Sequence, residues 1–120
     1  MGNGNLGGIT AKNMGTVDNC YNTSDMQFYH NSVRSVGGIV AWNMKDGSNQ
    51  GRVTNSNQYG YIYTTEAGYL NGESRLGGII GHNQGYFDGT GSRGSWHYWY
   101  NKDNDKYCFK NYDGRVGKQG

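Results

Sequence analysis

The chain has 120 residues, a formal net charge of +2, 14% aromatic residues, 22 glycines and no proline. This length allows one domain, and the small net charge argues against a disordered polyelectrolyte and against a nucleic-acid-binding surface. We therefore expect no nucleic-acid partner. No segment is long and apolar enough to cross a membrane, so we expect no membrane insertion either.

A double-glycine motif recurs along the chain and sets the phase of the other segments. It reads Leu6-Gly7-Gly8-Ile9, then Val36-Gly37-Gly38-Ile39, then Leu76-Gly77-Gly78-Ile79, with a broken fourth copy at Val116-Gly117-Lys118. The intervals of 30, 40 and 40 residues are typical of repeat arrays. We therefore treat residues 1–120 as one unit with repeats 6–35, 36–75 and 76–115 and a partial fourth repeat at 116–120.

The segment after each double glycine has the alternation of a β-strand. Alternation places three columns on one face, which we expect to be buried: Ile9/Ile39/Ile79, Ala11/Ala41/Gly81 and Asn13/Asn43/Asn83. The other face, which we expect to be solvated, carries Thr10/Val40/Ile80 and Lys12/Trp42/His82. If the repeats stack in parallel, the Asn amides can hydrogen-bond along their column.

Two further blocks recur in the same phase, which suggests three strands in each repeat. One block aligns Val17 to Asn19 with Val53 to Asn55 and with Phe87 to Gly89. The other aligns Tyr29 with Tyr69 and Phe109, and Asn31 with Asn71 and Asn111. Glycine at the corners allows turn dihedral angles that other residues resist.

The run from Gly7 to Tyr21 reads Gly-Gly-Ile-x-x-x-Asn-x-Gly-x-Val-x-Asn-Cys-Tyr and resembles the GLUG repeat. That family occurs in large bacterial surface proteins: adhesins, filamentous-haemagglutinin-like proteins and non-catalytic regions of some IgA-specific peptidases. The resemblance covers nearly the whole chain, although repeat three has Phe87 and Gly89 where the motif has Val and Asn. It implies a short right-handed parallel β-helix (a β-solenoid) of about three rungs in an extracellular setting, and it brings no catalytic residue.

Insertions lengthen the second and third repeats. Repeat two adds the polar segment from Met44 to Gln50 and the alternating run from Tyr59 to Tyr63. Repeat three adds two aromatic runs, 96–100 and 106–109, around the polar segment 101–105, which predicts a β-hairpin. We expect these hairpin insertions at one corner of the solenoid, where insertions often form a binding face.

The aromatic side chains of these insertions are the best candidates for a ligand site, because aromatic rings with a polar group stack on sugars and mediate protein contacts. The candidates are Trp96, Tyr98, Trp99, Tyr100 and Tyr107 of the hairpin, with Tyr61 and Tyr63 of the neighbouring repeat. Tyr59 belongs to the same aromatic cluster. The alternative is that these rings pack the hairpin onto the solenoid.

Other candidates are weaker. Lys12, Trp42 and His82 form either a cation–π stack or three separate solvated positions. Asp18 and Asp88 fall two repeats apart at matching positions, which corresponds to roughly 9 to 10 Å in stacked strands. Inverting glycosidases place their two carboxyl groups at a similar distance. The alternation of Asn101, Asp103 and Asp105 resembles a calcium loop, but a hairpin turn fits better because the later Gly and Glu are missing.

Cys20 and Cys108 lack metal-ligand spacing, and a disulfide between them would cross two rungs, so we expect free thiols and no metal or cofactor.

These observations favour a non-catalytic, adhesin-like binding or scaffolding module that binds a glycan or a surface protein. The alternative is a structural stalk or a self-stacking filament subunit, and a polysaccharide-cleaving enzyme is a third, weaker reading. The sequence has no signal peptide, so the extracellular location rests on the family resemblance. The chain reads as a fragment of a longer solenoid, or as a unit that stacks end to end with another copy.

Overall fold

The computed structural model describes residues 5–28, 35–64, 75–92, 94, 97–101, 106–110 and 115–120. These residues form strands and turns and no helix, so this part of the chain is all-β, as expected. Accordingly, no helix within the described ranges could span a membrane.

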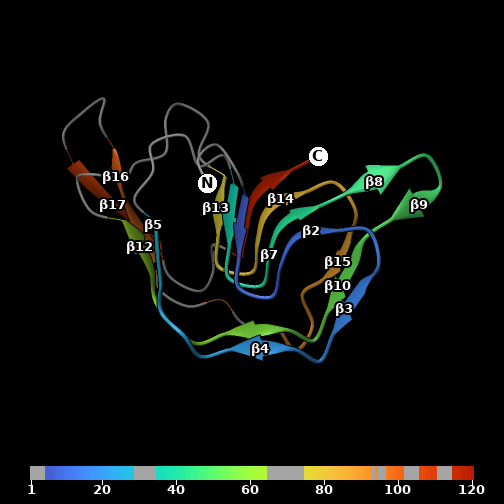
Figure 1. The fold of residues 1–120 in the computed structure, drawn as a ribbon, viewed down its shortest axis with the longest axis horizontal. Helices are drawn as coiled ribbons and strands as arrows, with labels where there is room; N and C mark the ends of the chain where they lie inside the picture. The colour runs from blue at the N-terminus through green and yellow to red at the C-terminus, as the bar shows by residue number, and fades with distance from the viewer. Residues whose placement is uncertain are drawn as a thin grey trace.

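The strands form five sheets and one separate hairpin (Figure 1). The first sheet holds β1 (Asn5–Gly7), β6 (Ser35–Gly37) and β13 (Leu76–Gly77), and the second holds β2 (Thr10–Asn13), β7 (Val40–Asn43), β14 (Ile80–Asn83) and β18 (Val116–Gln119). The third holds β3 (Thr16–Asp18), β10 (Arg52–Thr54) and β15 (Tyr86–Asp88), and the fourth pairs β4 (Tyr21–Asn22) with β11 (Asn57–Gln58). The fifth holds β5 (Met26–Phe28), β12 (Ile62–Thr64), β16 (His97–Asn101) and β17 (Lys106–Lys110), while β8 (Lys45–Asp46) and β9 (Asn49–Gln50) form the hairpin.

Equivalent positions of successive repeats pair in parallel. Val36 lies between Leu6 and Leu76, and Val53 lies between Val17 and Phe87. The phase predicted from the double glycines is therefore confirmed for the first three repeats. Within the described ranges, the antiparallel pairings are those of the two hairpins, β8–β9 and β16–β17.

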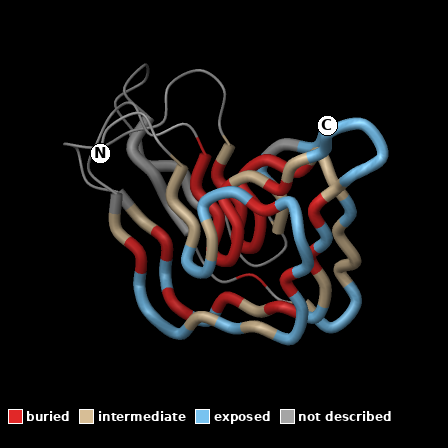
Figure 2. Tube along the Cα trace, turned by 45° about the vertical axis from the view of Figure 1, so that its right-hand side comes forward, coloured by how far each residue is buried: buried red, intermediate tan, exposed pale blue. Residues whose placement is uncertain are grey.

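Two apolar clusters lie on either side of the first two sheets. One packs the first sheet against the fifth through Met26, Val36, Ile62 and Leu76. The other packs the second sheet against the third through Val17, Ile39, Val40, Val53, Ile79 and Ile80. The buried strands in the middle of the molecule belong to the first two sheets (red in Figure 2).

The first two sheets touch back to back at the double glycines. A Cβ atom on Gly37 would lie 1.9 Å from the carbonyl oxygen of Val40 and 2.7 Å from the backbone nitrogen of Gly81. Since no side chain tolerates such distances, glycine at this position is what lets β6 and β7 fold back on each other.

The face of the second sheet that we expected to be solvated is largely buried. Val40 and Ile80 are fully buried and His82 nearly so, whereas Lys12 is exposed. The reason is that β7 and β14 are covered on both sides, by the glycines of the first sheet and by the apolar residues of the third. Periodicity alone predicts one buried face, and these strands have two.

The expected inner columns are buried in the second and third repeats, whereas in the first repeat Asn13 is buried and the other two positions are exposed. Ile39 and Ile79 are fully buried, whereas Ile9 is 47% exposed and Ala11 is also exposed. Each of the strands β1 to β5 pairs on one side only. We call these five strands, residues 5–28, the open edge.

The predicted asparagine ladder is present and longer than expected. The Asn13 Nδ2 atom donates to Asn43 Oδ1 (3.0 Å), Asn43 Nδ2 donates to Asn83 Oδ1 (2.8 Å), and Asn83 Nδ2 donates to Gln119 Oε1 (3.1 Å). The Asn13 and Asn43 amide groups also donate to the backbone at the corner, to the carbonyl oxygens of Gly15 and Gly51 respectively. The ladder thus satisfies buried carbonyl groups where the chain turns.

The fourth copy of the motif does not occupy the position that its sequence suggests. Val116 pairs with Ile80 in β14 and not with Leu76 in β13. The backbone N–H groups of Ile79 and Ile80 both donate to the carbonyl oxygen of Arg115, which fixes this register. Val116 is therefore the structural equivalent of Ile80 and not of Leu76, so the last repeat interval is four residues shorter than the Val-Gly dipeptide implied.

A two-residue shift also occurs after β15. Asn19 and Asn55 turn the corner with positive φ angles of 55° and 48°, and the third repeat uses Gly91 there (φ 73°) instead of the expected Gly89. The Ser56 N–H group donates to the Ser92 hydroxyl (2.8 Å), which confirms that Gly91 and Ser92 are the equivalents of Asn55 and Ser56.

The insertions lie on two sides of the molecule, not at one corner. The β8–β9 hairpin projects from the end of β7, while the β16–β17 hairpin extends the fifth sheet on the opposite side (Figure 1). The N–H group of Gly51 donates to the carbonyl oxygen of Met44 (2.8 Å), so the inserted residues are 45–50.

Candidate binding surfaces

The predicted hairpin is present, and its strands add to the edge of the fifth sheet. Tyr98 pairs with Tyr63 across to β12 and with Phe109 across to β17. Tyr100 pairs with Tyr107 one step further along the hairpin. Trp99 pairs with Cys108, and Trp96 lies outside the described residues. The backbone thus brings the predicted aromatic positions of the hairpin next to Tyr63.

The two predicted tyrosines of the second repeat differ in their surroundings. Tyr61 is 53% exposed, and its N–H group donates to the Asp25 carboxylate (2.8 Å). Tyr63 is half-buried, and its hydroxyl donates to Gln27 Oε1 (3.3 Å) on the neighbouring strand. Ile62 between them is fully buried in the first apolar cluster.

Sequence reasoning counted Tyr59 with the aromatic cluster but left Tyr21 out of it. Tyr21 is 66% exposed and Tyr59 is 54% exposed, and their rings meet edge to face with centroids 6.3 Å apart. The signal that could have found Tyr21 is its place directly after the Asn-Cys of the repeat motif. Parallel stacking of β4 on β11 then brings it to the segment that carries Tyr59.

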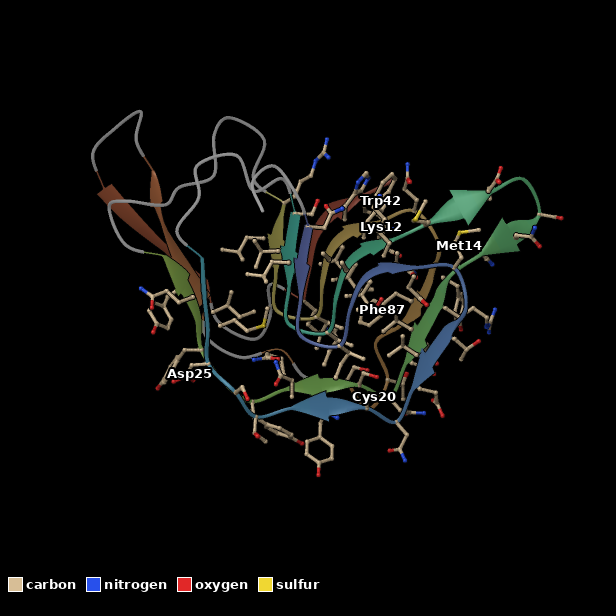
Figure 3. The ribbon with its side chains drawn as sticks, in the orientation of Figure 1. Lys12, Met14, Cys20, Asp25, Trp42 and Phe87 are labelled. Atoms are coloured by element: carbon tan, nitrogen blue, oxygen red, sulfur yellow. The ribbon has the colours of Figure 1, made fainter. Side chains whose placement is uncertain are left out.

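The column Lys12–Trp42–His82 is a cation–π stack, one of the two expected alternatives (Figure 3 labels Lys12 and Trp42). The Lys12 Nζ atom lies 5.5 Å from the Trp42 ring centroid, and the Trp42 and His82 rings are parallel within 3° at 6.1 Å. The Trp42 Nε1–H group donates to Gln84 Oε1 (2.8 Å), which fixes the ring. This column has structural partners at each step.

Asp18 and Asp88 lie in register with Thr54 between them, as expected. Hydrogen bonds from the side chains of Thr54 (2.5 Å) and Asn55 (3.2 Å) lower the pKa of Asp18. Hydrogen bonds from the backbone N–H and the side chain of Thr90 lower the pKa of Asp88. An inverting glycosidase needs one carboxyl group with a raised pKa as its acid, and this pair does not supply one.

Among the remaining candidates, Cys20 is the one whose side chain the structure describes. Cys20 is a free thiol whose Sγ atom donates to the carbonyl oxygen of Asp18 (3.3 Å), whereas only the backbone of Cys108 is described. Asp103 and Asp105 lie outside the described residues. Within the part of the chain that the structure covers, no three His, Cys, Asp or Glu side chains cluster as metal ligands would.

Comparisons with known proteins gave no match: none to a family model, none to a curated protein and none to a solved structure. The resemblance to GLUG repeats therefore stays a prediction from the sequence.

Proposed function

We propose that the chain is a short parallel β-solenoid that serves as a non-catalytic, adhesin-like binding or scaffolding module at a cell surface. The in-register parallel pairing of three repeats supports the solenoid, because each repeat uses the one before it as a template. Right-handedness and the extracellular location rest on the resemblance to GLUG repeats.

The observation that carries the binding role is the register of the fifth sheet. The hairpin adds two strands whose positions Tyr98 and Phe109 continue the line of Tyr63. Alternation gives Tyr98 and Tyr100 the same parity as Tyr63, and gives Trp99 the parity of the buried Ile62. We therefore assign ligand contact to Tyr63, Tyr98 and Tyr100, and packing to Trp99.

A glycan array tests this assignment with the native chain and the double variant Tyr98→Ala/Tyr100→Ala. We expect the signal for the best ligands to fall at least about tenfold in the double variant, because aromatic side chains dominate the binding energy of such surfaces. Tyr86→Ala is a matched control, since Tyr86 is 39% exposed but belongs to β15. Equal losses in the double variant and the control would contradict a site on the hairpin.

A structural stalk or self-stacking subunit is the second candidate, and the open edge favours it. Ile9 is 47% exposed and Met14 is 39% exposed, and they lie in the bends on either side of β2, a strand that pairs on one side only. Sedimentation velocity over a hundredfold range of concentration separates the two functions. Growing polymers would support the stalk, whereas a constant monomer would support a binding module alone.

A polysaccharide-cleaving enzyme is the third candidate and the weakest. It would need a general acid other than Asp18 or Asp88, because hydrogen bonds lower the pKa of both carboxyl groups.

A further inference from the structure

Three exposed tyrosines lie along the corner between the fourth and fifth sheets, and the rings of two of them, Tyr21 and Tyr59, are in contact. Tyr21 precedes this corner in the first repeat, and Tyr59 and Tyr61 flank Gly60 in the second. Each of the three side chains is more than half exposed, at 66%, 54% and 53%. Contiguous exposed apolar groups are more informative about binding than single exposed residues, which are normal on any surface.

The backbone under these rings is hydrogen-bonded to the first repeat. The Tyr59 N–H group donates to the carbonyl oxygen of Asn22 (2.8 Å), and the Tyr61 N–H group donates to Asp25 Oδ1 (2.8 Å). Gly60 between them is buried, and a Cβ atom there would lie 2.1 Å from the carbonyl oxygen of Ser24. The two repeats therefore touch directly at Gly60, and the rings on either side of it are presented on a fixed support.

The chemistry of this corner narrows the ligand class. The segments 21–25 and 59–61 contain three tyrosines, hydroxyl and amide side chains, and one carboxylate at Asp25 (labelled in Figure 3), but no lysine or arginine. Phosphate and sulfate groups need basic partners, and this corner repels them. Tyrosine rings offer apolar faces and hydroxyl groups together, and Asp25 offers an acceptor for a hydroxyl donor.

We propose that the corner formed by Tyr21, Tyr59, Tyr61 and Asp25 is a second binding site, which takes a neutral carbohydrate. The rings stack on the C–H faces of sugar units, and the Asp25 carboxylate accepts a hydrogen bond from a sugar hydroxyl. Tyr21 and Tyr59 lie on and beside the fourth sheet, whereas the hairpin extends the fifth sheet. Tyr61 directly precedes β12, which pairs with β16, so Tyr21 and Tyr59 are the residues that distinguish this site from the proposed hairpin site.

An NMR titration of the ¹⁵N-labelled full chain tests this proposal with three neutral probes: cellohexaose, chitohexaose and a mannohexaose. We expect at least one probe to shift the amide signals of residues 21–25 and 57–61 in a saturable way. In the variant Tyr21→Ala/Tyr61→Ala the affinity should fall at least about tenfold, while Tyr98→Ala/Tyr100→Ala should leave these shifts unchanged.

The variant Asp25→Asn separates a carbohydrate site from a general aromatic patch. Losing the carboxylate should weaken the binding of the neutral sugar, and a sulfated hexasaccharide should not bind this corner of the native chain. Each of three results would overturn the proposal: no shifts at millimolar sugar, shifts confined to 97–110, or shifts that survive Tyr21→Ala/Tyr61→Ala. Tyr61→Phe, which keeps the ring, guards against a folding defect, because it should retain stacking.

Discussion

At the scale of single residues, the asparagine ladder joins successive repeats through buried side-chain hydrogen bonds. Asn43 is fully buried and uses its amide group fully: it accepts from Asn13 and donates to Asn83 and to the carbonyl oxygens of Gly51 and Tyr86. An amide group in this setting joins three repeats at one point. Its removal leaves buried carbonyl groups without donors.

We expect Asn43→Ala to lower the free energy of unfolding by about 3 kcal/mol, because several hydrogen bonds are lost and their partners stay buried. Asn49→Ala is the control, since Asn49 is exposed in the β8–β9 hairpin, and its effect should stay within about 0.5 kcal/mol. Urea denaturation followed by circular dichroism measures both values. A loss below about 1 kcal/mol for Asn43→Ala would show that the ladder is incidental.

Asp18 gives the protein an acid-sensitive stabilising contact. Its pKa in the folded state is lowered from an ordinary value of 3.8, so the unfolded state binds protons first as the pH falls. The contribution is fully present above pH 3.8 and is lost as the pH falls through the lower folded pKa. Thr54→Val removes the larger cause of the shift.

We expect Thr54→Val to make the urea midpoint less dependent on pH between about 5 and 2.5 than that of the native chain, because Asp18 then titrates nearer its unfolded value. Thr64→Val is the comparison variant, since Thr64 ends β12 and pairs with Phe28, away from both aspartates. Parallel pH curves for Thr54→Val and the native chain would refute a role for this hydroxyl.

At the scale of elements, the β8–β9 hairpin is an addition to a complete repeat. In the first repeat Met14 and Gly15 are adjacent, and in the second repeat the equivalents Met44 and Gly51 are joined by a hydrogen bond across the hairpin base. The strands on either side of the hairpin, β7 and β10, still pair in parallel with β2 and β3 of the first repeat.

Deletion of residues 45–50 should therefore leave the fold intact, with a change in unfolding free energy within about 1 kcal/mol, because the loop is only shortened to its counterpart in the first repeat. Deletion of 52–57, of equal length, should abolish folding because it removes β10 and its pairing on both sides. Thermal melts by circular dichroism distinguish the two. Unfolding of the first variant would mean that the hairpin has a structural role.

The elements also show where sequence reasoning reached its limit. The double glycines and the asparagines fixed the pairing of three repeats, because each carries a backbone or hydrogen-bonding requirement that no other residue meets. Val116-Gly117 carried no such requirement, and the carbonyl group of Arg115 set its register instead. The burial of Val40 could not be predicted from the sequence, because alternation within one strand does not show that both faces of β7 are covered.

The candidate sites were predicted with the same unevenness. Two aromatic runs around a polar turn were enough for the β16–β17 hairpin. Tyr21 escaped notice because its neighbour Tyr59 is 38 positions away in sequence and meets it only through parallel stacking.

At the scale of the whole molecule, the two ends of the stack differ. The open edge consists of five strands paired on one side only, whereas β17 and β18 extend two sheets at the far end. Equivalent residues should therefore contribute unequally to stability, according to whether another repeat covers them.

We expect Ile39→Ala to destabilise the protein by about 3 kcal/mol, since Ile39 is fully buried, and Ile9→Ala by less than about 1 kcal/mol, since Ile9 is 47% exposed. Hydrogen exchange should show the same order, with amide groups of β2 exchanging faster than those of β7. Equal costs for the two substitutions would indicate that something covers the open edge in solution.

The parallel register has a mechanical consequence. The ladder hydrogen bonds between repeats run along the stack, so a force that pulls residue 5 away from the rest loads them one after another. The first repeat should separate at low force, while β6 and its neighbours stay folded. A protein made of such units would lengthen under load in steps of one repeat and refold when the load is released.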